Sequence, residues 1–178
     1  MKTLILGGAR SGKSRFAEEL VLKSKLKAVY IATASANDPE MEARIKKHQQ
    51  QRGSQWQNYE EPIQLIRTLE QTVNKETYVL VDCLTLWLTN LLLEKEQENN
   101  IVKIEQQLVQ LCDSVKTLNG DVIFVSNEVG LGIVPMGELS RQFCDLTGQL
   151  HQQLAKCCNQ VIFMVAGIPQ IIKDSNSY

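Results

Sequence analysis

Residues 4–15 read Leu-Ile-Leu-Gly-Gly-Ala-Arg-Ser-Gly-Lys-Ser-Arg, and the organisation of the chain follows from this segment. The segment matches the P-loop pattern G-x-x-x-x-G-K-[ST] without a mismatch, through Gly7, Gly12, Lys13 and Ser14. The apolar run at residues 3–6 predicts a buried parallel strand, and residues 12–25 predict an amphipathic helix. A strand, a glycine-rich turn and a helix in this order are the setting that the motif requires, which argues against a chance match.

This segment predicts a binding site for a nucleoside triphosphate. Glycines let the backbone wrap closely, so that its N–H groups and the N-terminus of the following helix point at phosphate oxygens. Lys13 is expected to reach a bridging or terminal phosphate, and the Ser14 hydroxyl is expected to bind Mg²⁺. The motif alone identifies neither the base of the nucleotide nor the reaction.

Length and composition set the frame around this site. The 178 residues predict one domain, residues 1–178, that buries its own core. The net charge of −1, with no basic block, argues against non-specific nucleic-acid binding. No apolar segment approaches the length of a membrane span, and the first strand follows Met1 so closely that no signal peptide is expected. Five cysteines without a C-x-x-C pair indicate reduced thiols, and we therefore expect a cytoplasmic protein.

Apolar strand segments alternate with helical segments after this first unit. The predicted strands cover residues 28–32, 77–81, 121–126 and 160–165, and residues 170–173 are a candidate antiparallel edge strand. Strands that alternate with helices predict an α/β fold with a mainly parallel sheet and helices on both faces. In such a sheet the carboxyl ends of the strands meet at one edge, where ligands bind.

Polar residues follow several predicted strands at that edge. Thr33 and its small neighbours follow the second strand, and Asn127-Glu128 follows the fourth. Asp82 ends the third strand in a Walker-B-like pattern, so its carboxylate is expected to hold Mg²⁺ beside Ser14. The loop of residues 127–135 combines glycines with apolar residues, which is typical of a substrate surface or a subunit surface as well as of a structural loop.

A stripe of basic residues lies on the helix predicted from Asp38 to about Gly53. Arg44, His48 and Arg52 are spaced i, i+4 and i+8, so they share one face. Two guanidinium groups can clamp phosphate oxygens, and they disfavour a third positive charge between them. A neutral imidazole held there is a candidate nucleophile toward phosphorus. The alternative is a solvated basic face with an idle histidine, but the helix starts from the ligand-binding edge of the sheet, which favours the nucleophile.

Several segments together resemble one enzyme family. In chain order they are Gly-Gly-Ala-Arg-Ser-Gly-Lys-Ser (7–14), Tyr-Ile-Ala-Thr (30–33), Arg-Ile-x-x-His-x-x-x-Arg-x-x-x-Trp (44–56), Leu-Thr-Asn-Leu-Leu (88–92), Ser-Asn-Glu-Val-Gly-x-Gly-Ile-Val-Pro (126–135) and Arg-x-Phe-x-Asp-x-x-Gly-x-x-x-Gln-x-Leu-Ala (141–155). Over residues 1–173 the sequence is similar to the bifunctional adenosylcobinamide kinase/adenosylcobinamide-phosphate guanylyltransferases of cobalamin biosynthesis, the CobU/CobP family.

The resemblance implies a RecA-like P-loop fold and a homotrimer. It implies phosphorylation of the aminopropanol hydroxyl of adenosylcobinamide by ATP or GTP, then transfer of GMP from GTP, giving adenosylcobinamide-GDP and pyrophosphate. It also implies that His48 carries the GMP as a covalent guanylyl-histidine. The nucleotide contacts that it implies are Gly7, Gly8, Ala9, Arg10, Ser11, Gly12, Lys13, Ser14, Ala32, Thr33, Ala34, Gln49, Gln50, Gln51, Arg52, Glu60 and Asp82.

Two other functions compete with this one. A plain P-loop small-molecule kinase would use the basic helix only to bind phosphates and would form no covalent intermediate. A nucleotide-dependent switch or assembly ATPase would hydrolyse nucleotide without a corrinoid. Some members of the family carry Glu where this chain has Asp82, which leaves its role open between metal binding and a contact to the nucleotide ribose or base. For the corrin ring the candidate surface is Val129 to Pro135, alone or completed by a neighbouring subunit.

Overall fold

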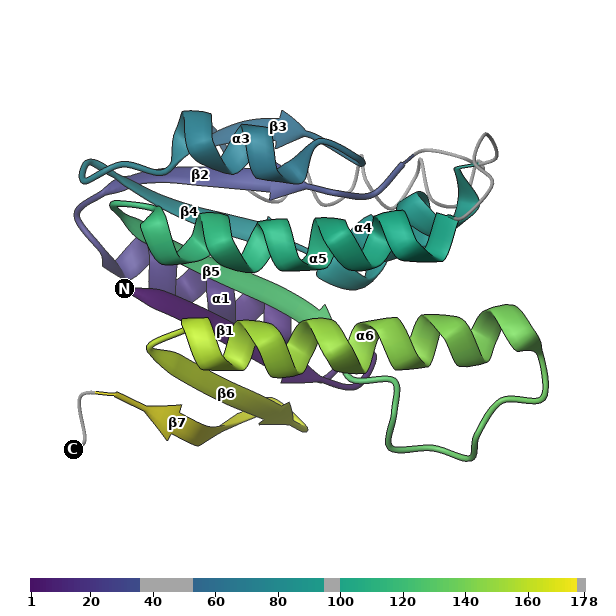
Figure 1. The fold of residues 1–178 in the computed structure, drawn as a ribbon. Helices are drawn as coiled ribbons and strands as arrows, with labels where there is room; N and C mark the ends of the chain where they lie inside the picture. Colours follow the sequence, from purple (N-terminus) through teal and green to yellow (C-terminus); the bar gives the residue numbers. More distant parts are fainter. Residues whose placement is uncertain (36–52, 95–99, 176–178) are drawn as a thin grey trace.

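A computed structural model describes residues 1–35, 53–94 and 100–175, and its centre is a seven-stranded sheet (Figure 1). The strands are β1 (Lys2–Gly7), β2 (Lys27–Ala32), β3 (Trp56–Glu60), β4 (Thr77–Asp82), β5 (Asp121–Asn127), β6 (Gln160–Val165) and β7 (Ile168–Asp174). The helices in the described ranges are α1 (Lys13–Lys23), α3 (Leu65–Thr72), α4 (Leu84–Leu93), α5 (Asn100–Thr117) and α6 (Glu138–Cys157).

The order of the strands is β3-β2-β4-β5-β1-β6-β7. Every neighbouring pair is parallel except β6 and β7, which run antiparallel. The predicted mainly parallel sheet with an antiparallel edge strand is confirmed. Strand β7 is longer than the predicted segment 170–173, and the Lys173 ammonium holds it to the end of α6 by donating to the carbonyl oxygens of Ala155 and Cys158 at 2.8 and 2.7 Å.

Strand β3 adds an edge that the apolar pattern of the sequence does not identify. Its residues Trp-Gln-Asn-Tyr-Glu pair in parallel with β2, from Ala28 opposite Trp56 to Ala32 opposite Glu60. Only Trp56 is fully buried in this strand, and its ring meets the edge of the Tyr30 ring at a centroid distance of 5.7 Å. An edge strand has one neighbour and an open side, so it needs few apolar residues and gives a weak sequence signal.

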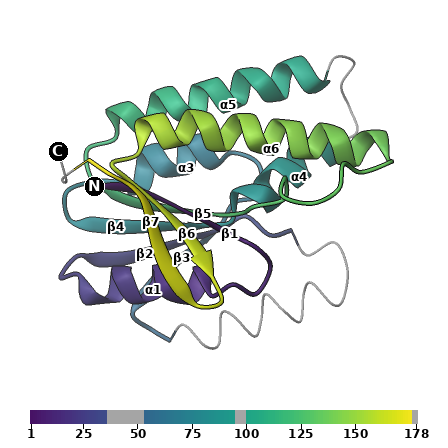
Figure 2. The same cartoon turned by 90° about the horizontal axis from the view of Figure 1, so that it is seen from below.

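Helices cover both faces of the sheet, as predicted. Helix α1 packs against one face, and α3, α4, α5 and α6 pack against the other (Figure 2). The alternation of side chains along β1 separates the two cores: Leu4 belongs to the core under α3–α6, and Ile5 belongs to the core under α1. Both side chains are fully buried, as expected of a central parallel strand with helices on each face.

The connection between β3 and α3 is fixed by local hydrogen bonds. Glu61 Oε1 accepts from the backbone N–H groups of Ile63 and Gln64 at 3.0 and 2.7 Å, so α3 begins only at Leu65. The indole N–H of Trp87 in α4 donates to the Ile63 carbonyl oxygen at 2.9 Å. These bonds attach the edge of the sheet at β3 to α4, which starts directly after Asp82.

Candidate nucleotide site

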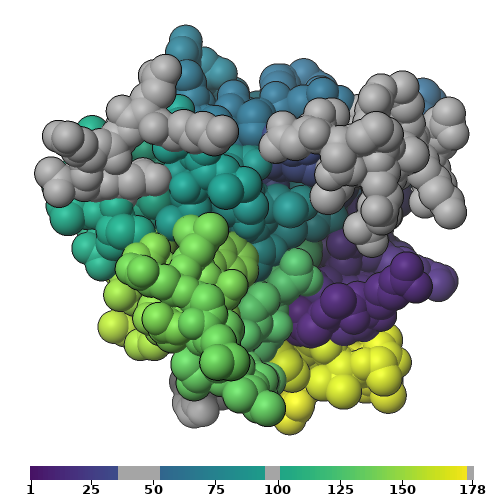
Figure 3. Space-filling view, turned by 90° about the vertical axis from the view of Figure 1, so that its right-hand side faces the viewer, coloured from purple at the N-terminus to yellow at the C-terminus, as the bar shows by residue number. Residues whose placement is uncertain are grey.

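The predicted edge residues meet where parallel strands end. In the sheet register Gly7 lies opposite Asn127, and Ala32 lies opposite Asp82. Backbone hydrogen bonds continue this pairing past the strand ends, from Glu128 N to the Gly7 carbonyl oxygen at 3.0 Å and from Thr33 N to the Asp82 carbonyl oxygen at 3.2 Å. Figure 3 looks onto this end of the sheet, where the N-terminal segment lies between green and yellow C-terminal parts of the chain. The structure thus brings the predicted edge residues of the described ranges together.

The P-loop has a backbone that glycine makes possible. Gly12 has φ 93°, and it immediately precedes the first residue of α1. A Cβ at Gly7 would lie 2.5 Å from the Met164 carbonyl oxygen, too close for any side chain. Strand β6 therefore packs directly against the loop, and Gly167 N donates to the Ser11 carbonyl oxygen at 2.9 Å. Strand β6 and the turn after it thus contact one side of the loop, while Gly8, Ala9 and Arg10 remain exposed.

The Lys13 side chain folds back into this loop. It is only 6% exposed, and its Nζ donates to the Gly8 carbonyl oxygen at 2.6 Å and lies 3.4 Å from Ser11 Oγ. Burial lowers the pKa of the Lys13 ammonium, and the negative charge of Asp82 opposes that shift. A cation held in a loop of backbone N–H groups is suited to phosphate oxygens, which would replace its carbonyl partner.

Asp82 lies on the strand two places from β1, with β5 between them. Its Oδ2 accepts from the Tyr30 hydroxyl at 2.7 Å, which fixes the carboxylate at the end of β4. The described residues contain no cluster of three or more His, Cys, Asp or Glu side chains that would form an all-protein metal cage. One carboxylate and the Ser14 hydroxyl instead suit Mg²⁺, which usually takes one or two protein ligands together with substrate phosphates and water. That assignment stays a prediction.

Thr33 connects the ends of β2 and β4. Its Oγ1 accepts from Cys83 N at 2.9 Å and donates to the Cys83 carbonyl oxygen at 2.6 Å. Its own carbonyl oxygen accepts from Asn90 Nδ2 at 2.7 Å, and Asn90 Oδ1 accepts from Ser35 Oγ at 2.9 Å. Sequence reasoning did not single out Asn90, although an amide within the apolar helix α4 is a signal for a local partner. The expected contact of Thr33 with the nucleotide stays a prediction, and the structure gives its side chain a positioning role.

Replacing Thr33 with valine tests that role. The change leaves the buried N–H and carbonyl groups of Cys83 without the hydroxyl, so we expect unfolding free energy to fall by about 1–3 kcal/mol. Thr33→Ser retains the hydroxyl and serves as the matched control. Urea denaturation of the three proteins gives the comparison, and equal midpoints for Thr33→Val and the unmodified protein would show that the hydroxyl is not needed.

A buried polar chain lies next to the P-loop and was also missed. His151 Nε2 of α6 lies 2.7 Å from Ser126 Oγ, and His151 Nδ1 lies 3.7 Å from Glu128 Oε2. Burial lowers the pKa of the His151 imidazole, and the Glu128 charge opposes the shift. The sequence contains a signal for this chain, because His151 lies on the apolar face of a long helix together with Leu150 and Leu154. A histidine at such a position predicts a buried polar partner.

The loop that follows Glu128 exposes apolar side chains. Ile133 and Met136 are 97% and 96% exposed, and Leu131 and Val134 are also largely exposed. The guanidinium of Arg141 donates to the carbonyl oxygens of Pro135 and Met136 at 3.2 and 2.5 Å, which ties the end of the loop to α6. Such a group of apolar side chains beside a binding edge is typical of a surface that meets a ligand or a partner.

Several predicted site residues lie outside the described residues. They are Arg44, His48, Gln49, Gln50, Gln51 and Arg52. Of the remaining predicted contacts, Glu60 is exposed at the end of β3, and Ala32 and Ala34 are half-buried on either side of Thr33. The described residues place the P-loop, Thr33, Asp82 and Glu60 at one edge of the sheet, and the roles of these residues stay predictions.

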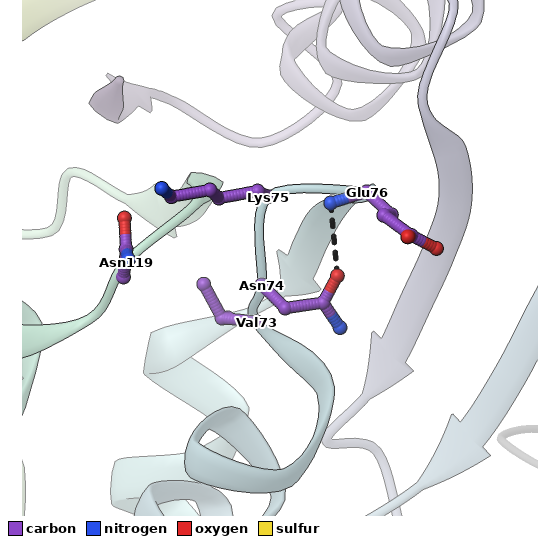
Figure 4. A pocket seen from close by; sticks show the side chains of 5 residues that line it. All are labelled: Val73, Asn74, Lys75, Glu76 and Asn119. Atoms are coloured by element: carbon purple, nitrogen blue, oxygen red, sulfur yellow. Dashed lines mark hydrogen bonds between the residues drawn. The ribbon is translucent and has the colours of Figure 1, made fainter.

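One surface pocket has no part in this site. It measures about 470 Å³ and is lined by Val73, Asn74, Lys75, Glu76 and Asn119 (Figure 4). These residues precede β4 and β5, so the pocket lies at the amino ends of the strands. Ligands of open α/β sheets bind at the carboxyl ends, and the pocket contains none of the chemistry described above.

A family model and curated relatives match nearly the whole chain. A model of the family described as cobinamide kinase / cobinamide phosphate guanyltransferase matches residues 3–172. The bifunctional adenosylcobalamin biosynthesis protein CobP of Pseudomonas aeruginosa is 49% identical over 173 residues, covering 97% of this chain and 98% of that protein. The bifunctional adenosylcobalamin biosynthesis protein CobU of Escherichia coli is 38% identical, covering 97% of this chain and 100% of that protein.

Two solved structures share the fold at much lower sequence identity. A protein from Pyrococcus horikoshii OT3 has a TM-score of 0.55 and 10% identity, covering 97% of this chain and 86% of that chain. The RadB recombinase has a TM-score of 0.50 and 19% identity, covering 91% and 73%. These likenesses show the fold alone, and they confirm the predicted RecA-like P-loop architecture. Within the described ranges, no helix has both the length and the apolar character needed to cross a bilayer.

Proposed function

Because this chain belongs to the cobinamide kinase / cobinamide phosphate guanyltransferase family, we propose that it catalyses both of the reactions that give the family its name. It phosphorylates the aminopropanol hydroxyl of adenosylcobinamide with ATP or GTP. It then transfers GMP from GTP onto the new phosphate, giving adenosylcobinamide-GDP and pyrophosphate. The observation that carries the proposal is the family match over residues 3–172, which spans every described element at the binding edge.

The P-loop provides the kinase half of this chemistry. Backbone N–H groups of residues 7–14 and the Lys13 ammonium hold the phosphates and meet the charge that develops on the transferred group. Ser14 and Asp82 would hold Mg²⁺, which neutralises charge on the phosphate oxygens when it is bound. Ala32, Thr33, Ala34 and Glu60 lie at the carboxyl ends of β2 and β3 and would contact the nucleoside.

His48 provides the transferase half. Its neutral imidazole attacks the α-phosphorus of GTP, an N–P bond forms, and the bond to the bridging oxygen breaks so that pyrophosphate leaves. Arg44 and Arg52, four positions before and after His48 in the sequence, would clamp the phosphate oxygens, and Gln49, Gln50 and Gln51 would add nucleotide contacts. An oxygen of the corrinoid phosphate then attacks the phosphorus and the N–P bond breaks. Two separate displacements predict ping-pong kinetics.

The corrinoid needs a broad apolar surface beside this edge. The exposed loop from Val129 to Pro135 provides one directly after Glu128, and we assign the corrin ring to it. A neighbouring subunit of a homotrimer would complete that surface, since so many exposed apolar side chains form only one wall of a site. The five cysteines are all free thiols, which suits the cytoplasm, where we expect the reaction to take place.

Product analysis tests the proposed function. The protein is incubated with adenosylcobinamide, Mg²⁺ and either ATP alone or ATP with GTP, and the corrinoids are separated and identified by mass spectrometry. ATP alone is expected to give the corrinoid phosphate, and added GTP is expected to give the GDP derivative with one pyrophosphate per product. A phosphate that never advances would indicate a plain kinase. Nucleotide hydrolysis that is indifferent to the corrinoid would indicate a switch or assembly ATPase.

A further inference from the structure

Among the described carboxylates at the carboxyl ends of the strands, Glu128 lies closest along the sheet to the P-loop strand. Its N–H donates to the Gly7 carbonyl oxygen at 3.0 Å, on the strand next to β1. Neighbouring strands are about 4.8 Å apart, so Asp82 on β4 is roughly 10 Å and Glu60 on β3 roughly 19 Å from β1. The Asp82 carboxylate moreover accepts from the Tyr30 hydroxyl, and Glu61 Oε1 accepts from the backbone N–H of Ile63.

The Glu128 side chain is held in place and still reaches solvent. Its Oε1 accepts from Gly130 N at 2.6 Å, and its Oε2 faces His151 Nδ1 at 3.7 Å. The side chain is 22% exposed, while Ser126 behind His151 is completely buried. The carboxylate therefore lies at the surface of the edge with its rear fixed by protein groups.

The groups that face His151 favour one arrangement of its protons. A carboxylate oxygen only accepts, so we place the imidazole proton on Nδ1, which faces Glu128 Oε2 at 3.7 Å, and Nε2 then accepts from the Ser126 hydroxyl at 2.7 Å. Burial lowers the pKa of the His151 imidazole, which favours its neutral form. Ser126 is inaccessible, so the Ser126–His151–Glu128 series is not a nucleophile with its base. Glu128 is the solvent-accessible residue of this series, and Ser126 and His151 orient its carboxylate.

The kinase step requires a proton acceptor that the phosphate-binding groups do not supply. Lys13, the loop N–H groups and Mg²⁺ all meet negative charge, whereas the attacking hydroxyl must lose a proton. We propose that Glu128 accepts this proton and that His151 is a positioning residue for it. The inference rests on the proposed function, and it places the acceptor hydroxyl between the P-loop and the apolar loop that follows Glu128.

The step balances without any further reactant. The hydroxyl oxygen of the corrinoid side chain attacks the γ-phosphorus, and a new O–P bond forms. The bond from that phosphorus to the β–γ bridging oxygen breaks, and the nucleoside diphosphate leaves with the electron pair. The hydroxyl proton passes to the Glu128 carboxylate and is afterwards released to water.

Glu128→Gln tests the acceptor, because glutamine still accepts from Gly130 N but takes up no proton. We expect the phosphorylation kcat to fall about 10²- to 10⁴-fold relative to the rate at which the same preparation forms its covalent GMP adduct. Glu138→Gln, an exposed position at the start of α6, is the matched control. Phosphorylation by Glu128→Gln within a few-fold of the unmodified protein would overturn the inference and leave the proposed function intact. Absence of both reactions in the unmodified protein would instead overturn the proposed function.

A second pair of variants tests the positioning role. The amide of His151→Gln can accept from Ser126 and donate to Glu128, whereas His151→Leu can do neither. We expect the leucine variant to lose phosphorylation kcat by more than about 10-fold at an unchanged KM for ATP, and the glutamine variant to recover most of that loss. Equal losses of phosphorylation and adduct formation, or no difference between leucine and glutamine, would show that His151 only fills the core.

Discussion

Lys13→Met is expected to lower the rate of corrinoid phosphorylation by about 10²- to 10³-fold, the loss that follows removal of one preorganised charged or polar donor from a reacting centre. Its Nζ lies 2.6 Å from the Gly8 carbonyl oxygen inside the P-loop, where a phosphate would be held. Methionine has a similar length and no charge, so the variant separates the ammonium from the volume of the side chain. Steady-state kinetics with adenosylcobinamide and ATP give the measurement.

The same variant should fold at least as well as the unmodified protein. Burial lowers the pKa of the Lys13 ammonium, because the folded protein removes water from around this charge. We therefore expect Tm to stay the same or rise, because binding sites commonly trade stability for function. Lys23→Met, at the exposed end of α1, is the control for the loss of a lysine. A large fall in Tm, or unimpaired phosphorylation by Lys13→Met, would contradict the assigned role.

His48→Asn is expected to abolish transfer of GMP while corrinoid phosphate still accumulates. An asparagine side chain offers no nucleophilic nitrogen, so the N–P bond of the intermediate cannot form. Radiolabelled GTP, with the label at the α-phosphate, should leave acid-labile label on the unmodified protein and none on the variant. Arg44→Gln is a useful comparison, because it removes one predicted phosphate contact and leaves His48 in place. We expect this variant to incorporate label more slowly than the unmodified protein.

Label on the His48→Asn protein would exclude this histidine as the carrier of GMP. Formation of the GDP derivative by the variant would show direct transfer between the two substrates. Either outcome would leave the kinase half of the proposal standing, because that half depends on the P-loop and on the edge of the sheet.

Much of the fold follows from local sequence patterns. The P-loop, the apolar strands and the intervening helices predict the parallel sheet, and the end of each strand predicts which residues share an edge. Strand β3 escaped this reasoning because its polar sequence belongs to an edge, where one neighbour and one buried ring are enough. The periodicity of apolar residues reflects burial, and an edge strand has few buried residues.

The position of the P-loop between β1 and α1 was likewise predictable, because one short motif specifies the strand, the turn and the helix. The supporting groups were not, since their partners are distant in the chain. Asn90 meets Thr33 from 57 positions away, and His151 meets Ser126 from 25 positions away. A single polar residue in an apolar helix predicts that its side chain has a hydrogen-bond partner. Only the packing of α4 and α6 on the sheet identifies that partner.

We propose that one chain holds GTP in its P-loop and receives GMP on His48. Mass spectrometry of the protein after incubation with GTP and Mg²⁺, first intact and then after proteolysis, detects this intermediate. We predict a gain of one GMP per chain, located on the peptide that contains His48, lost in acid and discharged by corrinoid phosphate. GMP attached to another residue, or formation of the GDP derivative by a protein that never carries GMP, would exclude the His48 intermediate.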